Sequence, residues 1–160
     1  MPLENHPVTR DYQVASGRRE TVETIRFEAE DVAVLQVMRA VLDEMSRARI
    51  VGGSQRALHE AARAVQSPHA AAFLGSLQCI LRELGRVRTS QFNFIPADDP
   101  NAARFVTREE VVLVRLLHFA CADAAAAFQT QLIMLCEGGD ATRVMSEAYL
   151  ARDLIRAKGG

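Results

Sequence analysis

His118 and Cys121 are the residues whose types and spacing come closest to a metal or ligand site. An imidazole and a thiol three residues apart share one surface of a helix, and Asp123 follows nearby. The sequence contains no Glu-x-x-His or His-x-x-x-His pair to complete a two-metal site. The simpler interpretation is a partly buried, hydrogen-bonded histidine. We therefore keep His118, Cys121 and Asp123 as a candidate site, and expect no bound metal or cofactor.

His59, Glu60 and Arg63 offer the beginning of a phosphotransfer site. An exposed imidazole can accept a phosphoryl group, the adjacent acid can orient the ring, and a cation one turn later can bind the phosphate. The Lys-Gly that follows such a histidine in phosphotransfer domains is absent. The alternative is a solvated helix face. Phosphotransfer by His59 is therefore an alternative function.

Between residues 86 and 106 lies a long irregular stretch that combines basic and aromatic side chains. Arg88 and Arg104 could contact phosphate groups. Phe92 and Phe94 fall on one side of a short extended run, and could stack on bases or attach the loop to the rest of the protein. Nearby acidic residues leave the segment only weakly positive. These four residues are a candidate interaction site, but we do not expect nucleic-acid binding.

The composition is that of an ordinary globular protein. The chain has 160 residues, of which 49% are hydrophobic and 24% charged, enough to form one sizeable core. Its formal charge of -1 provides no field to attract nucleic acid or acidic lipid. All but one of the 19 basic residues are arginine, which we interpret as the coding habit of a GC-rich bacterial genome.

Cysteine usage suggests a reducing compartment. Cys79, Cys121 and Cys136 lack Cys-x-x-Cys spacing and lie in apolar helical stretches, as buried thiols do. No apolar run of signal-peptide length occurs near the N-terminus. We therefore expect a cytoplasmic protein.

The element expected to position these residues is one long apolar helix from Thr107 to Cys136. Thr107 and Glu110 have the spacing of a capping box, and Gly138-Gly139 would end the helix. On a helical wheel, Ala124 lies at the centre of the buried face, where we expect the closest helix crossing. The uncharged stretch of about 13 residues is shorter than the roughly 20 needed to span a membrane.

Four further helices are expected, each with one apolar face. They cover residues 30–49, 54–66, 67–85 and 141–157. Their inward residues include Leu58 in the second, Phe73, Leu77, Ile80, Leu81 and Leu84 in the third, and Val144, Ala148, Ala151 and Ile155 in the fourth. In the first of these helices, the wheel places Arg39 on the outer, polar face.

These observations predict an all-α, single-domain bundle of about five helices at residues 22–160, preceded by a polar arm at residues 1–21. Residues 22–27 could be extended or helical. Five apolar faces exceed what a small bundle needs, so we expect a regulatory or assembly protein that binds as a homodimer, or binds another protein. We expect neither membrane insertion nor enzymatic activity.

Overall fold

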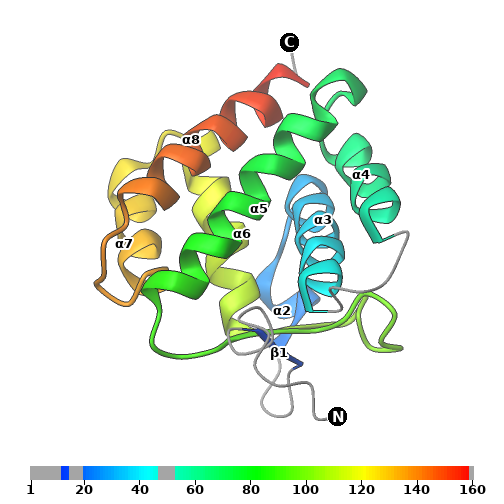
Figure 1. Ribbon diagram of the computed structural model, residues 1–160, viewed down its shortest axis with the longest axis horizontal. Helices are drawn as coiled ribbons and strands as arrows, with labels where there is room; N and C mark the ends of the chain where they lie inside the picture. Colours follow the sequence, from blue (N-terminus) through cyan, green and yellow to red (C-terminus); the bar gives the residue numbers. More distant parts are fainter. Residues whose placement is uncertain (1–11, 15–19, 47–52, 159–160) are drawn as a thin grey trace.

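Helices form the body of the protein in the computed structural model, which describes residues 12–14, 20–46 and 53–158. The described part contains six helices of at least 11 residues: α3 (Ala29–Ser46), α4 (Gly53–Ala64), α5 (Ala70–Val87), α6 (Arg108–Cys121), α7 (Ala125–Leu135) and α8 (Thr142–Ala157). A short helix α2 (Val22–Ile25) and a 3-10 turn η1 (Ser67–His69) accompany them. The helical fold class is confirmed (Figure 1).

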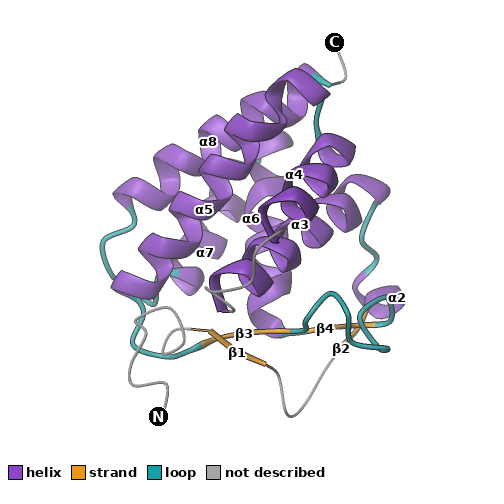
Figure 2. Cartoon of the chain, turned by 45° about the vertical axis from the view of Figure 1, so that its right-hand side comes forward, coloured by secondary structure: helices purple, strands orange, loops and turns teal. Residues whose placement is uncertain are grey.

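Two short strand pairs lie at the base of the helices (Figure 2). Strand β1 (Tyr12–Val14) pairs in parallel with β3 (Phe92–Phe94), and β2 (Glu20–Thr21) pairs antiparallel with β4 (Phe105–Val106). The sequence predicted the extended run at 92–94, but no strands within the N-terminal arm. Residues 1–11 and 15–19 of that arm, and the predicted helix end at Arg49, lie outside the described residues.

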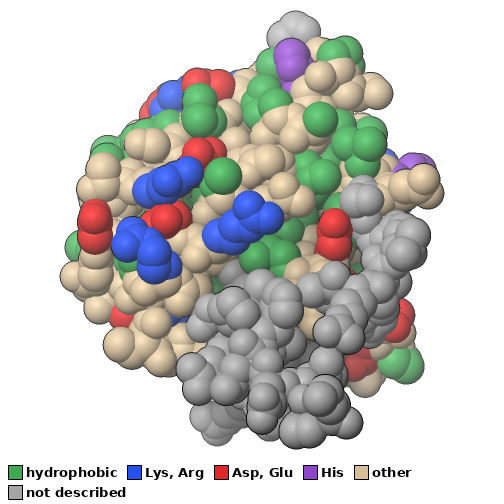
Figure 3. Space-filling model, in the orientation of Figure 1, with side chains coloured by type: hydrophobic (Ala, Val, Ile, Leu, Met, Phe, Trp, Pro, Cys, Tyr) green, Lys and Arg blue, Asp and Glu red, His purple; other side chains and the backbone are tan. Residues whose placement is uncertain are grey.

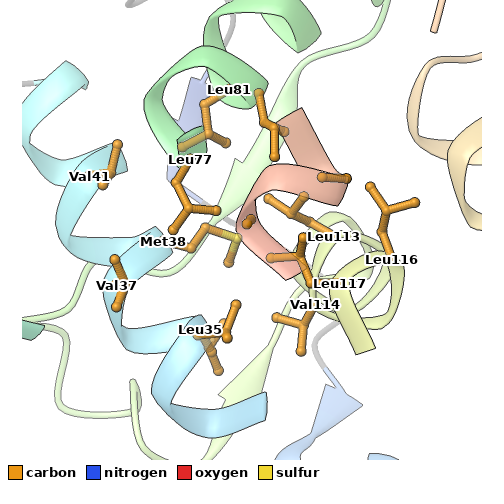
Figure 4. Packing of buried hydrophobic residues seen from close by; sticks show 14 of the residues in the cluster. Leu35, Val37, Met38, Val41, Leu77, Leu81, Leu113, Val114, Leu116 and Leu117 are labelled. Carbon is orange, nitrogen blue, oxygen red and sulfur yellow. The ribbon is translucent and has the colours of Figure 1, made fainter. Parts of the chain in front are cut away.

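The inward faces of α5 and α8 are as predicted. The five apolar residues named for the helix at 67–85 are all fully buried, and so are the four named for the last helix, apart from slight exposure of Ile155. Alanines on α8 allow it to pack closely against α5. Figure 4 shows how Met38 reaches from α3 toward Leu77 of α5 and Leu113 of α6, so that three helices meet in one core.

The predicted long central helix is wrong, because the chain breaks it into α6 and α7. The capping box at its start is present: the Thr107 hydroxyl accepts the N–H of Glu110 at 3.1 Å, and the Glu110 carboxylate accepts the N–H of Thr107 at 2.9 Å. The helix then ends at Cys121, and α7 packs against α6 instead of continuing it. This break also makes the predicted number of about five helices too low.

The break is centred on Asp123, which has a left-handed backbone with φ of 55°. Aspartate tolerates this conformation better than most residues, and here Arg156 of α8 holds it in place. The Arg156 guanidinium lies 2.7 Å from the Asp123 carboxylate and donates to the Cys121 carbonyl at 2.7 Å. Ala124 thus precedes α7 and is only partly buried, so the expected close crossing at Ala124 is wrong.

The buried face of α4 differs from the predicted one by about one residue. Ala57 and Ala61 are fully buried, whereas Leu58, predicted to point inward, is 43% exposed. The small alanine side chains allow α3 and α4 to approach closely, and this packing decides which face turns inward.

Arg39 is the largest departure from the predicted core. It is fully buried, and its guanidinium donates to both oxygens of the fully buried Glu110, at 2.9 and 3.0 Å. It also donates to the carbonyl oxygens of Ala102 and Phe105. Glu110 in turn accepts the N–H of Ile95 at 2.9 Å. This network attaches the segment between β3 and α6 to α3, so the prediction of Arg39 on a polar face is wrong.

Within the described part of the chain, none of the helices has the length and apolar character needed to cross a lipid bilayer.

Candidate functional site

The end of α6 meets the beginning of α3 at His118. Its Nδ1 atom lies 3.1 Å from Oδ1 of Asp31, and the two side chains are 36% and 12% exposed, respectively. The imidazole also packs edge-on against Phe119, with ring centroids 5.5 Å apart. His118 is therefore a partly buried, hydrogen-bonded histidine, as the simpler interpretation of the sequence held.

Glu28 completes a group of three metal-ligating side chains at this point. One ligand atom each from Glu28, Asp31 and His118 lies within 4.8 Å of the other two. The second oxygen of Asp31, Oδ2, accepts the backbone N–H of Glu28 at 3.0 Å. This bond caps the first turn of α3 and fixes the Asp31 carboxylate, so that Oδ1 is left for His118.

Of the residues predicted to accompany His118, the structure brings only Cys121 near it. Cys121, His118 and Asp31 line a small cavity of about 30 Å³. Burial raises the pKa of the Cys121 thiol, although nearby Arg156 opposes the shift, so the thiol is protonated at neutral pH. Asp123 instead pairs with Arg156. Sequence reasoning missed Asp31 and Glu28 because they are about 90 residues away, and no local signal links them to His118.

The three residues of the phosphotransfer candidate lie together on α4. His59 is exposed, and the Arg63 side chain is largely exposed as well. However, the Arg63 guanidinium lies 3.9 Å from the Glu60 carboxylate, so the cation and the acid face each other. The phosphotransfer hypothesis remains a prediction.

The loop candidate contributes little open surface. Phe92 and Phe94 are buried, so their rings attach the loop to the bundle and cannot stack on a base. The Arg88 side chain is only 8% exposed; it donates to the Leu135 carbonyl at 2.7 Å and to the Ser90 hydroxyl at 3.0 Å. Arg104 is exposed and lies over the Phe105 ring at 5.4 Å.

A larger cavity of about 190 Å³ lies beside Arg88, between α6 and the end of α7. Its lining combines both signs of charge, from Arg88, Arg108, Glu109 and Glu137. Glu137 accepts the Ser90 hydroxyl at 2.8 Å and the Ser90 N–H at 3.0 Å. The Arg88 guanidinium lies 3.5 Å from the Glu137 carboxylate and 3.9 Å from that of Glu109, and these contacts help to hold the 87–90 segment against the end of α7.

Glu137 gives this contact a pH dependence. The hydrogen bonds from Ser90, with Arg88 nearby, lower the pKa of the Glu137 carboxyl. A lowered pKa in the folded state stabilises the protein above the unfolded-state pKa of about 4.3, and that stabilisation is lost as the pH falls through the folded-state value.

Glu137→Gln should lower the free energy of unfolding at neutral pH by up to about 1 kcal/mol, since the side chain is partly exposed. The melting temperatures of the Glu137→Gln variant and of the wild type should be measured between about pH 3 and 7. They should become equal at the acidic end of this range. A difference that is constant across this range would contradict the assignment.

Charged side chains of opposite sign lie beside each other on the face shown in Figure 3, with apolar side chains between them. This mixed distribution agrees with the small net charge of the chain. Comparison with known protein families, curated proteins and solved structures found no match.

The exposed face of α7 is the remaining unusual surface. No residue of α7 carries a charge, yet only Phe128, Leu132 and Leu135 of this helix are buried. Ile133 is 59% exposed and Met134 is 40% exposed. Thr130 and Ala126 lie on the same side, one and two turns before them, respectively. Surface helices usually place charged residues on the side that faces water.

Proposed function

We propose that the protein works by binding rather than by catalysis, and that a second copy of the chain packs on the exposed face of α7. The observation that carries this proposal is the uncharged outer face of α7. Because the described chain covers only the inner side of this helix, Ile133 and Met134 remain in contact with water. Burying them against another protein would remove this apolar surface from water.

A second copy of the chain suits the exposed face of α7 because two copies of an uncharged face do not repel each other. In a twofold dimer the same patch meets its own copy, so a charged patch would bring like charges together. Residues 124–136 carry no charge. The Thr130 hydroxyl is already bonded to the Ala126 carbonyl at 3.1 Å, which lets the small side chains at 126 and 130 approach a partner helix.

The size of the face predicts a weak dimer. A helix of 11 residues is about 16 Å long. Such a face alone buries less than the roughly 800 Å² per partner that is typical of stable interfaces. We therefore expect self-association that depends on protein concentration and serves a regulatory or assembly role.

Sedimentation equilibrium over a range of micromolar concentrations tests the proposal. The wild type should change from monomer to dimer, whereas Ile133→Asp should remain monomeric, because a charge would be buried at the interface. The matched control is Leu58→Asp, which alters an exposed leucine on α4, far from α7 in Figure 1. A monomeric wild type at high micromolar concentration would exclude the dimer. Dissociation by Leu58→Asp alone would exclude α7 as the interface.

Phosphotransfer by His59 is the alternative function. It has less support, because Glu60 and Arg63 are positioned to neutralise each other.

A further inference from the structure

We propose that Glu28, Asp31 and His118 bind one divalent transition-metal ion, and that Zn²⁺ fits this site best. The spacing of the ligand atoms is the first argument. Bonds of about 2.0 to 2.2 Å in a tetrahedral site place two ligand atoms roughly 3.3 to 3.6 Å apart. His118 Nδ1 and Asp31 Oδ1 are already separated by 3.1 Å, and all three ligand atoms lie within 4.8 Å of one another.

The surrounding bonds orient the central ligand. Asp31 is held by the N–H of Glu28 through Oδ2, which directs Oδ1 toward His118. A ligand carboxylate fixed by a backbone hydrogen bond binds a metal ion with less loss of side-chain freedom. Glu28 is exposed, so its side chain can rotate toward the ion without repacking of the core.

Space and charge also suit a cation. A cavity of about 30 Å³, which Asp31 and His118 line but Glu28 does not, is large enough for one ion or one water molecule. Two carboxylates provide a charge that matches a divalent ion, and the imidazole provides a nitrogen ligand. The last turn of α6 adds the negative end of a helix dipole, although the first turn of α3 opposes it with its positive end.

The ligand types select the metal. Mg²⁺ and Ca²⁺ prefer sites made only of oxygen, and Cu⁺ prefers sulfur, whereas one imidazole with two carboxylates suits Zn²⁺. Three protein ligands leave a fourth position for water. Neither Cys121 nor Asp123 belongs to the group of closely spaced ligand atoms found in the described part of the chain. The proposed set therefore shares only His118 with the candidate site named from the sequence, for which no bound metal was expected.

Calorimetric titration of the metal-free protein with ZnCl₂ tests the site. The wild type should bind one Zn²⁺ per chain, and the melting temperature should rise with Zn²⁺ concentration. His118→Ala should abolish this binding, and Glu28→Gln should weaken it by at least about tenfold. The matched controls are Glu30→Gln, which changes another acid lining the same cavity, and His59→Ala on α4. Both controls should bind Zn²⁺ as the wild type does.

Glu28→Gln is the decisive variant because it separates binding from folding. Within the described residues the Glu28 carboxylate has no hydrogen bond or ion pair, and glutamine keeps the backbone N–H that caps α3. The metal-free melting temperature should therefore stay unchanged even if His118→Ala disturbs the fold. Absence of saturable Zn²⁺ binding by the wild type would overturn the proposal. An equal loss of Zn²⁺ affinity in Glu28→Gln and Glu30→Gln would overturn it too, because it would indicate general attraction of the ion to acidic residues. Performing the titration on the Ile133→Asp variant as well keeps this result independent of dimer formation.

Discussion

Arg39→Met should lower the free energy of unfolding by about 3 to 5 kcal/mol, which is what breaking a buried ion pair typically costs. The substitution leaves the Glu110 carboxylate buried without its cation, and it removes the donor for the carbonyls of Ala102 and Phe105. The shape of a methionine fills most of the arginine site, so the expected loss comes from charge and hydrogen bonding rather than from a cavity. Urea unfolding measures this loss of free energy, and the m-value should stay unchanged.

Arg115→Met is the matched control, since this arginine lies on α6 but is exposed, and its change should stay within about 0.5 kcal/mol. A double-mutant cycle with Glu110→Leu would isolate the coupling between Arg39 and Glu110. The double variant should still be less stable than the wild type, because Glu110 also accepts the N–H groups of Ile95 and Thr107. An Arg39→Met protein within about 1 kcal/mol of the wild type would contradict the buried pair.

Phe128→Ala should destabilise the protein by about 3 to 5 kcal/mol, through lost burial and the cavity left behind. Phe128 is almost completely buried and stacks on Tyr149 of α8, with ring centroids 5.0 Å apart. It is one of only three buried side chains on α7, so its removal should also loosen this helix from α8. Thermal unfolding and amide exchange of α7 measure the two effects.

Gln129→Ala, at the next and exposed position of the same helix, separates loss of the ring from a general effect on α7. It should change stability by less than about 0.5 kcal/mol. Phe128→Leu should cost much less than the alanine substitution, because it fills most of the space. Similar melting temperatures for the alanine and leucine variants would show that the ring does not hold α7 in place.

The sequence predicted best the helices whose apolar faces are simple. Val144, Ala148 and Ala151 recur at helical spacing, and this periodicity places them in the core. The division of the central helix could not be predicted in this way. Its alanine run favours continuous helix, but the contacts of Arg156 and the packing of α7 on α6 outweigh that preference.

The candidate site could be predicted only in part, for a related reason. His118 was identified by its residue type, but its partners depend on which helix ends meet in space. Asp31 appeared in the sequence only as an acid suited to the start of a helix. Arg39 was misplaced because a helical wheel assigns charged residues to the side that faces water. Glu110, the residue that stabilises its burial, is 71 residues away.

That separation has a consequence for the order in which the chain can fold during synthesis. At about 5 to 20 residues per second, roughly 4 to 14 s pass between the addition of Arg39 and that of Glu110. During this interval α3 and α4 can already pair, but the guanidinium must stay hydrated. Strands β1 and β2 likewise cannot pair until β3 and β4 have been synthesised. The N-terminal half of the nascent chain therefore completes its core only after the beginning of α6 has been made.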